Sequence, residues 1–129
     1  METKRSKFIN DGFIKIDQLI TAEEVDTLRT IYDKLLQDKV KTAHLRSDLA
    51  GADNSEDKKV ERITQIMRPS TIAKELIKNS AYKKAEQWAK VLLGEDMELD
   101  FDMMINKAPH TNTPTPWHQD AAYWIAMPD

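Results

Sequence analysis

Residues 97–106, MELDFDMMIN, carry the clearest structural pattern in this 129-residue chain. Apolar side chains occupy every odd position from Met97 to Ile105, and the even positions between them are mostly acidic or polar. Successive side chains of a β-strand point to opposite faces of its sheet, so this alternation predicts a strand with one apolar face. The segments on either side of this strand then decide what covers that face.

Helices are predicted before this strand. The motif TAEE is a capping box, in which Thr21 caps a helix and Glu24 reaches back to the cap. Apolar residues then recur at helical spacing and extend this helix to Asp38. A second helix is expected to begin at a cap on Ser80 and to end at Gly94. Its predicted apolar face contains Tyr82, Ala85, Trp88, Ala89 and Leu92.

Shorter elements and one long polar segment complete the pattern. Residues 8–20, FINDGFIKIDQLI, predict a short strand with a turn before it, and residues 63–67, ITQIM, predict another strand. A helical turn is expected over residues 71–78. Residues 39–62 are polar and carry turn-forming residues, so they are interpreted either as an active-site loop or as a mobile surface loop. These elements predict a single α+β domain over residues 1–129.

Composition narrows the classes of function. The chain has 19 Lys+Arg against 22 Asp+Glu, so no overall positive charge attracts nucleic acid. It has no cysteine, which excludes disulfides, thiolate–zinc sites and a cysteine nucleophile. No apolar run approaches the about 20 residues that cross a bilayer, and the N-terminus lacks the apolar region of a signal peptide. We therefore expect a cytoplasmic protein that binds neither nucleic acid nor a membrane.

Residues 113–124, TPTPWHQDAAYW, contain a candidate metal site in His118 and Asp120. The chain has 3 histidines and 13 aspartates, for which chance alone gives about 0.3 His-x-Asp pairs, so the pair by itself is weak evidence. A strand from Trp117 to Trp124 would point both side chains to one side. They could then bind one metal ion, and a second histidine would complete the facial triad of non-haem iron oxygenases. The alternative is two polar residues that fall close together by chance.

Four stretches, in this order, resemble the phytanoyl-CoA dioxygenase family of Fe(II)/2-oxoglutarate-dependent oxygenases. They are FxxDGFIxI with the helix after it, HLRSDLAG, MMINKAP and TPWHQDAAYW. The resemblance extends from Phe8 to Asp129. It implies N-terminal helices that flank a double-stranded β-helix, which is a jelly-roll or cupin-like barrel.

The same resemblance implies the residues of a site. His118 and Asp120 would bind Fe(II), and Gln119 between them would lie near the 2-oxoglutarate co-substrate. Met103 matches a position that lines the 2-oxoglutarate pocket, although simple core packing is an alternative. Gln65 matches a position that faces the co-substrate or substrate, although an ordinary strand residue is an alternative. Such enzymes use O₂ to oxidise a small organic molecule, and Asp120 favours hydroxylation because related halogenases lack this carboxylate.

Two features of the family are missing after Asp120. The resemblance calls for a second histidine ligand and for an arginine that pairs with 2-oxoglutarate. The residues after Asp120 contain neither, and His44 and His110 precede the motif and read as loop residues. We therefore expect the N-terminal half of an oxygenase, inactive alone, whose barrel is completed by a C-terminal half or by a second chain. The alternative is a non-catalytic binding or interaction protein in which His118 and Asp120 are vestigial.

Overall fold

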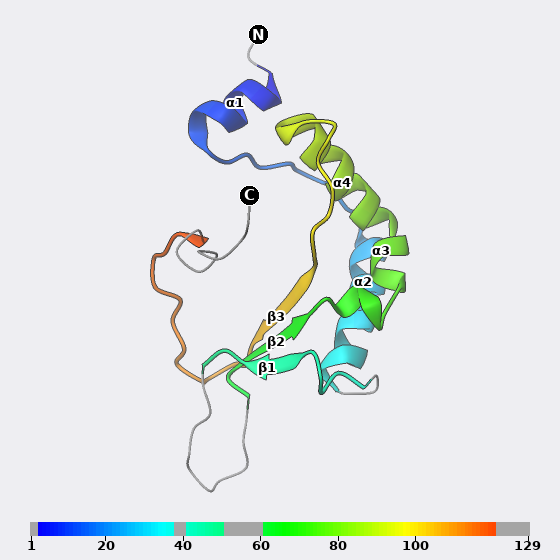
Figure 1. Ribbon diagram of the computed structural model, residues 1–129, viewed down its shortest axis with the longest axis vertical. Helices are drawn as coiled ribbons and strands as arrows, with labels where there is room; N and C mark the ends of the chain where they lie inside the picture. Colours follow the sequence, from blue (N-terminus) through cyan, green and yellow to red (C-terminus); the bar gives the residue numbers. More distant parts are fainter. Residues whose placement is uncertain (1–2, 38–40, 51–60, 121–129) are drawn as a thin grey trace, which may run out of the picture.

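The computed structural model describes residues 3–37, 41–50 and 61–120 of the chain (Figure 1). Helices and strands are mixed along the sequence. In chain order the elements are α1 (Lys4–Asp11), α2 (Ala22–Leu36), β1 (Arg46–Asp48), β2 (Ile63–Met67), the 3-10 helix η1 (Pro69–Thr71), α3 (Glu75–Lys78), α4 (Ser80–Leu93) and β3 (Met103–Lys107).

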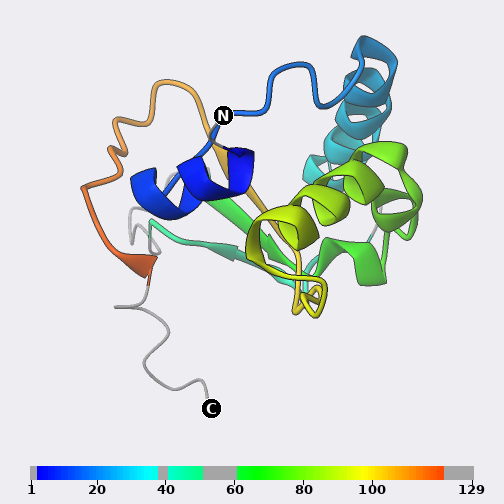
Figure 2. The ribbon, with the colours of Figure 1, turned by 90° about the horizontal axis from the view of Figure 1, so that it is seen from above.

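The three strands form one antiparallel sheet in the order β1-β2-β3. Gln65 in the central strand lies opposite Ser47 on one side and opposite Ile105 on the other. Helices α2, α3 and α4 gather on one side of the sheet, and residues 108–120 run along its other side (Figures 1 and 2). The sheet therefore has a helix-covered face and an open face.

The hydrophobic core lies between the helix-covered face and α2. Ile66 of β2 is 0 % exposed and Leu35 of α2 is 1 % exposed, and they pack with Ile31 and Ala73. Burying side chains of this size stabilises the fold by about 1.5–3 kcal/mol each. Alternation along β2 produces this arrangement, because Thr64 and Ile66 are buried while the residues between and beside them are only half-buried.

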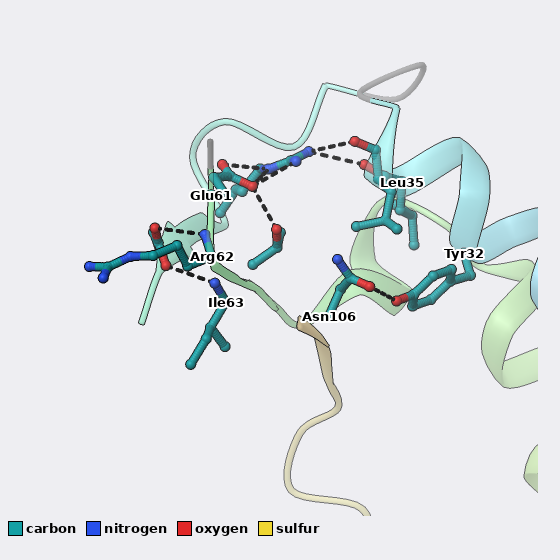
Figure 3. Close-up of polar contacts among 10 residues, drawn as sticks. Tyr32, Leu35, Glu61, Arg62, Ile63 and Asn106 are labelled. Atoms are coloured by element: carbon teal, nitrogen blue, oxygen red, sulfur yellow. Dashed lines mark hydrogen bonds and ion pairs between the residues drawn. The ribbon is translucent and has the colours of Figure 1, made fainter. Parts of the chain in front are cut away.

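Arg46 of β1 forms an ion pair with Glu61, which precedes β2, and hydrogen bonds to the end of α2 (Figure 3). The Nε of Arg46 donates to both carboxylate oxygens of Glu61 at 2.9 Å, and Nη2 lies 2.7 Å from Oε2. Its Nη1 donates to the carbonyls of Leu35 and Leu36 at 3.3 and 3.1 Å. The last carbonyls of a helix lack intrahelical partners, so Arg46 also caps α2. The hydrogen bond from Arg46 holds the pKa of Glu61 below its usual range.

The predicted capping box is confirmed and also connects two helices. The amide of Glu24 donates to Thr21 Oγ1 at 3.2 Å, and the amide of Thr21 donates to Glu24 Oε2 at 2.8 Å. The Glu24 carboxylate further accepts from Lys84 Nζ at 2.8 Å and from the Ser80 hydroxyl, both on α4. The hydrogen bonds from Lys84, then Ser80 and Thr21, lower the pKa of Glu24 to about 2.

The ends of α2 and α4 lie close to the predicted positions. Helix α2 ends at Leu36, two residues before Asp38, and α4 ends at Leu93 with Gly94 as its C-cap at φ 143°. The predicted cap on Ser80 is wrong. Asn79 caps α4 instead, by accepting a hydrogen bond from the Ala81 amide at 2.8 Å, because the Ser80 hydroxyl is directed to Glu24 on α2.

The strand predicted within residues 8–20 is wrong. Helix α1 occupies the first part of that segment, with Thr3 as its N-cap, and residues 13–20 contain no strand. Gly12 ends the helix in the left-handed conformation at φ 77°, so the Asp-Gly signal marks a helix terminus. Helix α1 contacts α4, where Lys4 Nζ lies 4.7 Å from the centre of the Trp88 ring.

Strand β3 begins six residues later than the alternation from Met97 predicts. Its partner β2 ends at Met67, and Arg68 then takes a left-handed conformation (φ 50°, ψ 47°) that leads into η1. The Asp102 carboxylate accepts hydrogen bonds from the amide and hydroxyl of Ser70, at 3.0 and 2.8 Å. The residues before Met103 therefore lie beside a turn and have no strand of β2 to pair with. Their alternating apolar and polar pattern is not sufficient to form a strand without such a partner.

The polar segment 39–62 contains a strand, β1, that its composition does not predict. Its last residue, Asp48, accepts hydrogen bonds from the amides of Ala50, Arg62 and Ile63 at 3.0 to 3.1 Å, and Figure 3 draws those from Arg62 and Ile63. Burial raises the pKa of Asp48, but these hydrogen bonds and the charge of Arg62 outweigh it and lower the pKa below its usual value. Residues 51–60 lie outside the described residues, so the role of the segment as an active-site or mobile loop stays a prediction.

The α+β class is confirmed. Within the described residues the sheet is open and three-stranded, and the predicted jelly-roll barrel is not confirmed. None of the helices in this part of the chain has the length and apolar character needed to cross a membrane.

Candidate metal centre

His118 and Asp120 lie side by side. The Nε2 of His118 is 3.2 Å from Oδ1 of Asp120, and its Nδ1 is 2.9 Å from the carbonyl oxygen of Pro116. A carbonyl oxygen only accepts, so Nδ1 is the protonated nitrogen in this contact. The Nε2 of His118 faces the Asp120 carboxylate, which only accepts, so a proton on Nε2 or a cation must lie between the two atoms.

The arrangement fits a bound divalent metal ion. Histidine ligands usually donate their second ring N–H to a backbone carbonyl or carboxylate, as His118 does to Pro116. Ligand atoms about 2.1 Å from a metal in adjacent, right-angled positions lie about 3 Å apart. The separation of 3.2 Å between Nε2 and Oδ1 agrees with that value. Asp120 is 84 % exposed at its side chain, so incoming ligands can reach the pair.

The two side chains approach each other for a reason other than the predicted strand. Residues 117–119 have no regular secondary structure, so the prediction of a strand is wrong there, and residues 121–124 lie outside the described residues. The contact to the Pro116 carbonyl orients the His118 ring instead. Proline favours an extended residue before it and has a fixed φ, so TPTP presents this carbonyl on a stiff segment.

A cavity of about 720 Å³ joins this pair to the open face of the sheet. The strands contribute Gln65 and Met67 of β2 and Met103 and Ile105 of β3, which lie across from His118 and Asp120. The Gln65 side-chain amide donates to the sulfur of Met103 at 3.0 Å and also contacts that of Met67. Four of the five predicted site residues, Gln65, Met103, His118 and Asp120, therefore line one cavity.

A comparison with protein families identifies the family of this chain. The family model described as phytanoyl-CoA dioxygenase (PhyH) matches residues 8–129. The chain belongs to the phytanoyl-CoA dioxygenase family. This family is part of the Fe(II)/2-oxoglutarate-dependent oxygenase superfamily. Searches of curated proteins and of solved structures returned no match for the chain.

Two groups expected of a phytanoyl-CoA dioxygenase family member, Gln119 and a third protein ligand for the metal, are not found at the cavity within the described residues. Gln119 is exposed and does not line it. No third histidine or acidic residue joins His118 and Asp120 as a cluster of three within residues 3–37, 41–50 and 61–120. A complete metal site in this family member would take its remaining ligands from co-substrate, water or residues beyond these.

The alternation phase that the sequence suggested for Met103 holds over part of its length. Phe101, Met103 and Ile105 line the same cavity, whereas Leu99 lines a different one beside α4. Met103 is 42 % exposed and Ile105 is 47 % exposed, so neither belongs to the buried core. The apolar face predicted from the sequence is thus the open face of the sheet, not the face that the helices cover.

Arg68 also lines the cavity, together with His118 and Asp120, and was not among the site residues predicted from the sequence. Its backbone is in the left-handed conformation, which is uncommon for a residue other than glycine or asparagine. Asp102 fixes this turn, because its carbonyl accepts from the Arg68 amide at 2.8 Å while its carboxylate binds Ser70. The one sequence signal is an arginine placed directly after a predicted strand and before a proline.

Proposed function

We propose that this chain provides two iron ligands and one wall of the active site of an Fe(II)/2-oxoglutarate-dependent hydroxylase that acts on a small organic substrate with O₂. The observation that carries the proposal is the contact between His118 Nε2 and Asp120 Oδ1 at 3.2 Å, at the edge of a cavity of about 720 Å³. Membership of the phytanoyl-CoA dioxygenase family supports this chemistry for the cavity.

His118 and Asp120 would hold the iron. The hydrogen bond from Nδ1 to the Pro116 carbonyl keeps the proton on that nitrogen, so Nε2 stays available to the metal. The Asp120 carboxylate supplies negative charge beside it, which suits a divalent cation. When bound, iron with 2-oxoglutarate and O₂ would supply the oxidising power for C–H hydroxylation.

The sheet residues would bind and orient the organic ligands. The Gln65 amide donates to two methionine sulfurs, and a thioether is a weak acceptor. A carboxylate of 2-oxoglutarate offers a stronger, charge-assisted hydrogen bond to the same amide. Met103 and Ile105 add an apolar wall that would exclude water from the reacting C–H bond.

Anaerobic titration of the chain with Fe(II) tests this proposal. We expect a visible absorption band that develops only when both Fe(II) and 2-oxoglutarate are present. His118→Ala should abolish it, and Gln65→Ala should weaken 2-oxoglutarate binding without abolishing it. His44→Ala is the matched control, because this exposed histidine lies in a different segment and should leave the band unchanged. A chain that shows no such band would favour the non-catalytic interaction protein.

Turnover is a separate question, because His118 and Asp120 are only two ligands. We propose that the chain alone does not complete the catalytic site and that a further protein ligand, from outside the described residues or from another chain, is needed. Coupled formation of succinate by the isolated chain, with Fe(II), 2-oxoglutarate and O₂, would contradict this part of the proposal. It would leave the iron assignment of His118 and Asp120 intact.

A further inference from the structure

The cavity beside the metal pair also contains a cationic side chain, Arg68, for which the proposed function gives no role. Within the described residues, its guanidinium group makes no hydrogen bond and no ion pair. The other arginines that touch the sheet are engaged, since Arg46 binds Glu61 and Arg62 donates to the carbonyl of Ala50 at 2.7 Å. Arg68 is therefore available for a ligand in a way that its neighbours are not.

The backbone of Arg68 is held in a conformation that is unfavourable in free energy. A left-handed conformation costs a residue with a Cβ about 1 kcal/mol or more, and such strain is found most often at functional sites. Pro69, which follows, is buried, and Asp102 accepts hydrogen bonds from the amides of both Arg68 and Ser70. These contacts fix the point at which the arginine side chain leaves the sheet, while the side chain itself is exposed in the cavity.

We propose that Arg68 binds the carboxylate of an organic acid that occupies the cavity with its apolar part against Phe101, Met103 and Ile105. A guanidinium group has a planar fork of N–H donors that matches both oxygens of a carboxylate. The apolar side chains of β3 suit a hydrocarbon body next to such a group. This inference rests on the proposed function for its location, since the bound acid would lie beside His118 and Asp120.

The acidic side chains that line the cavity do not prevent a carboxylate from binding to Arg68. Asp100 and Asp120 also line it and would repel a carboxylate. In the proposed function the metal ion offsets the charge of Asp120, whereas the chain without metal keeps both opposing charges. Asp100 is exposed and the Asp120 side chain is 84 % exposed, so solvent screens their repulsion more strongly than it screens a direct contact at Arg68.

The test uses the ¹⁵N-labelled full chain without iron and two probes, octanoate and its uncharged analogue octanamide. Octanoate should shift the Arg68 Nε–H resonance and should bind about 10-fold or more weakly to Arg68→Gln. Arg68→Lys keeps the charge without the fork and should give an intermediate affinity. Octanamide should bind wild type and both variants equally, and Asp100→Asn should bind octanoate no more weakly than wild type.

A second titration identifies the source of the carboxylate. Anaerobic Fe(II) and 2-oxoglutarate are added to wild type and Arg68→Gln, and the visible band is followed. A weaker 2-oxoglutarate affinity with unchanged octanoate binding assigns Arg68 to the co-substrate, and the reverse result assigns it to the primary substrate. Unchanged binding of both acids in a folded Arg68→Gln chain overturns the inference.

The two proposals fail in different ways. Loss of octanoate binding on Arg68→Gln, in a chain that never develops the iron band, would retain the carboxylate site and reject the oxygenase. An iron band in wild type, with no effect of Arg68→Gln on either acid, would retain the oxygenase and reject the carboxylate site. Dispersed amide signals in Arg68→Gln and Arg68→Lys establish that the variants fold.

Discussion

The two faces of the small sheet are built from the same three strands and differ in almost every other respect. The helix-covered face carries Ile66, which is 0 % exposed, and is tied to α2 through Arg46 and Glu61. The open face carries Met103 and Ile105, which are 42 % and 47 % exposed. Neighbouring residues of one strand, such as Met104 and Ile105, thus belong to a core and to a cavity.

This difference separates stability from function in a chain of modest size. Hydrophobic burial and the capping contacts are concentrated on the helix-covered face. His118, Asp120, Gln65 and Arg68 are all on the open side, where side chains remain accessible to ligands. Substitutions on the helix-covered face should therefore lower the stability of the fold, whereas substitutions on the open face should mainly change ligand binding. Both effects can be measured.

The largest effect is expected from truncating the core. Ile66→Ala removes a fully buried side chain at the centre of the sheet and should lower the free energy of unfolding by about 2–5 kcal/mol. Ile105→Ala removes the same groups from the open face and should cost less than about 1 kcal/mol. Urea denaturation followed by circular dichroism measures both. Equal losses would show that the open face is as well packed as the helix-covered one.

The Arg46 contacts should give the next largest effect. Arg46→Met removes the ion pair with Glu61 and the two hydrogen bonds to the end of α2, and should cost about 1–3 kcal/mol of unfolding free energy. Arg29→Met is the matched control, because its pair with Asp26 is 3.8 Å long and exposed. Such surface pairs contribute about 0–1 kcal/mol. If Arg29→Met costs as much as Arg46→Met, the geometry around Arg46 has no special weight.

A third effect depends on pH. The contacts of Glu24 with Lys84, Ser80 and Thr21 lower its folded-state pKa from 4.5 to about 2. The ionised carboxylate therefore stabilises the fold above about pH 4.5, and this contribution is lost as the pH falls through about 2. Thermal melts from pH 7 to pH 2 should show a smaller acid-induced loss for Glu24→Gln and for Lys84→Met than for wild type.

The same pH series can also contradict the role given to Glu24. If wild type and Glu24→Gln lose stability in parallel between pH 4.5 and 2, the carboxylate is not the group responsible. Asp48 and Glu61, whose pKa values are also lowered, would then carry the acid sensitivity. Both lie at the junction of β1 and β2, so the weak point would be the sheet rather than the contact between α2 and α4.

These contrasts explain which parts of the fold could be predicted from the sequence. The capping box at Thr21 and the amphipathic helices depend on residues three or four positions apart, so local patterns identify them. Strand β1 consists of three polar residues and exists because it pairs with β2, which lies more than a dozen positions away. The alternation from Met97 to Asp102 is real, but β2 ends before it could pair with these residues.

The candidate site also contains residues that local sequence suggests and residues that only the tertiary structure brings together. The motif around His118 and Asp120 is local, but the spacing of the pair is weak evidence by itself, and the family resemblance was needed to propose both residues as ligands. Gln65 and Met103 were suggested by the family resemblance, and the sheet register brings them to the cavity. Arg68 has no periodic partner and no motif. Its position in the cavity follows from the left-handed turn that Asp102 and Pro69 hold, which is a tertiary arrangement that sequence spacing does not reveal.

The smallest effect on the metal-free chain is expected at the metal pair. His118→Ala removes an exposed side chain that contacts the Pro116 carbonyl and Asp120, and it should change the unfolding free energy by less than about 0.5 kcal/mol. Co(II) is a redox-stable substitute for Fe(II) in this measurement. At free Co(II) 100-fold above its dissociation constant, ligand linkage should stabilise wild type by about 2.7 kcal/mol, and His118→Ala should lose this gain.

The unfolding free energies measured without and with Co(II) together distinguish a binding role of the open face from a structural one. A residue that matters only when metal is present belongs to a binding site, whereas one that matters without metal belongs to the fold. His44→Ala should retain the full Co(II) effect, because His44 is exposed and lies outside the cavity. If His118→Ala destabilised the metal-free chain as much as Arg46→Met does, the contact between His118 and Asp120 would be structural, and the functional distinction between the two faces would fail.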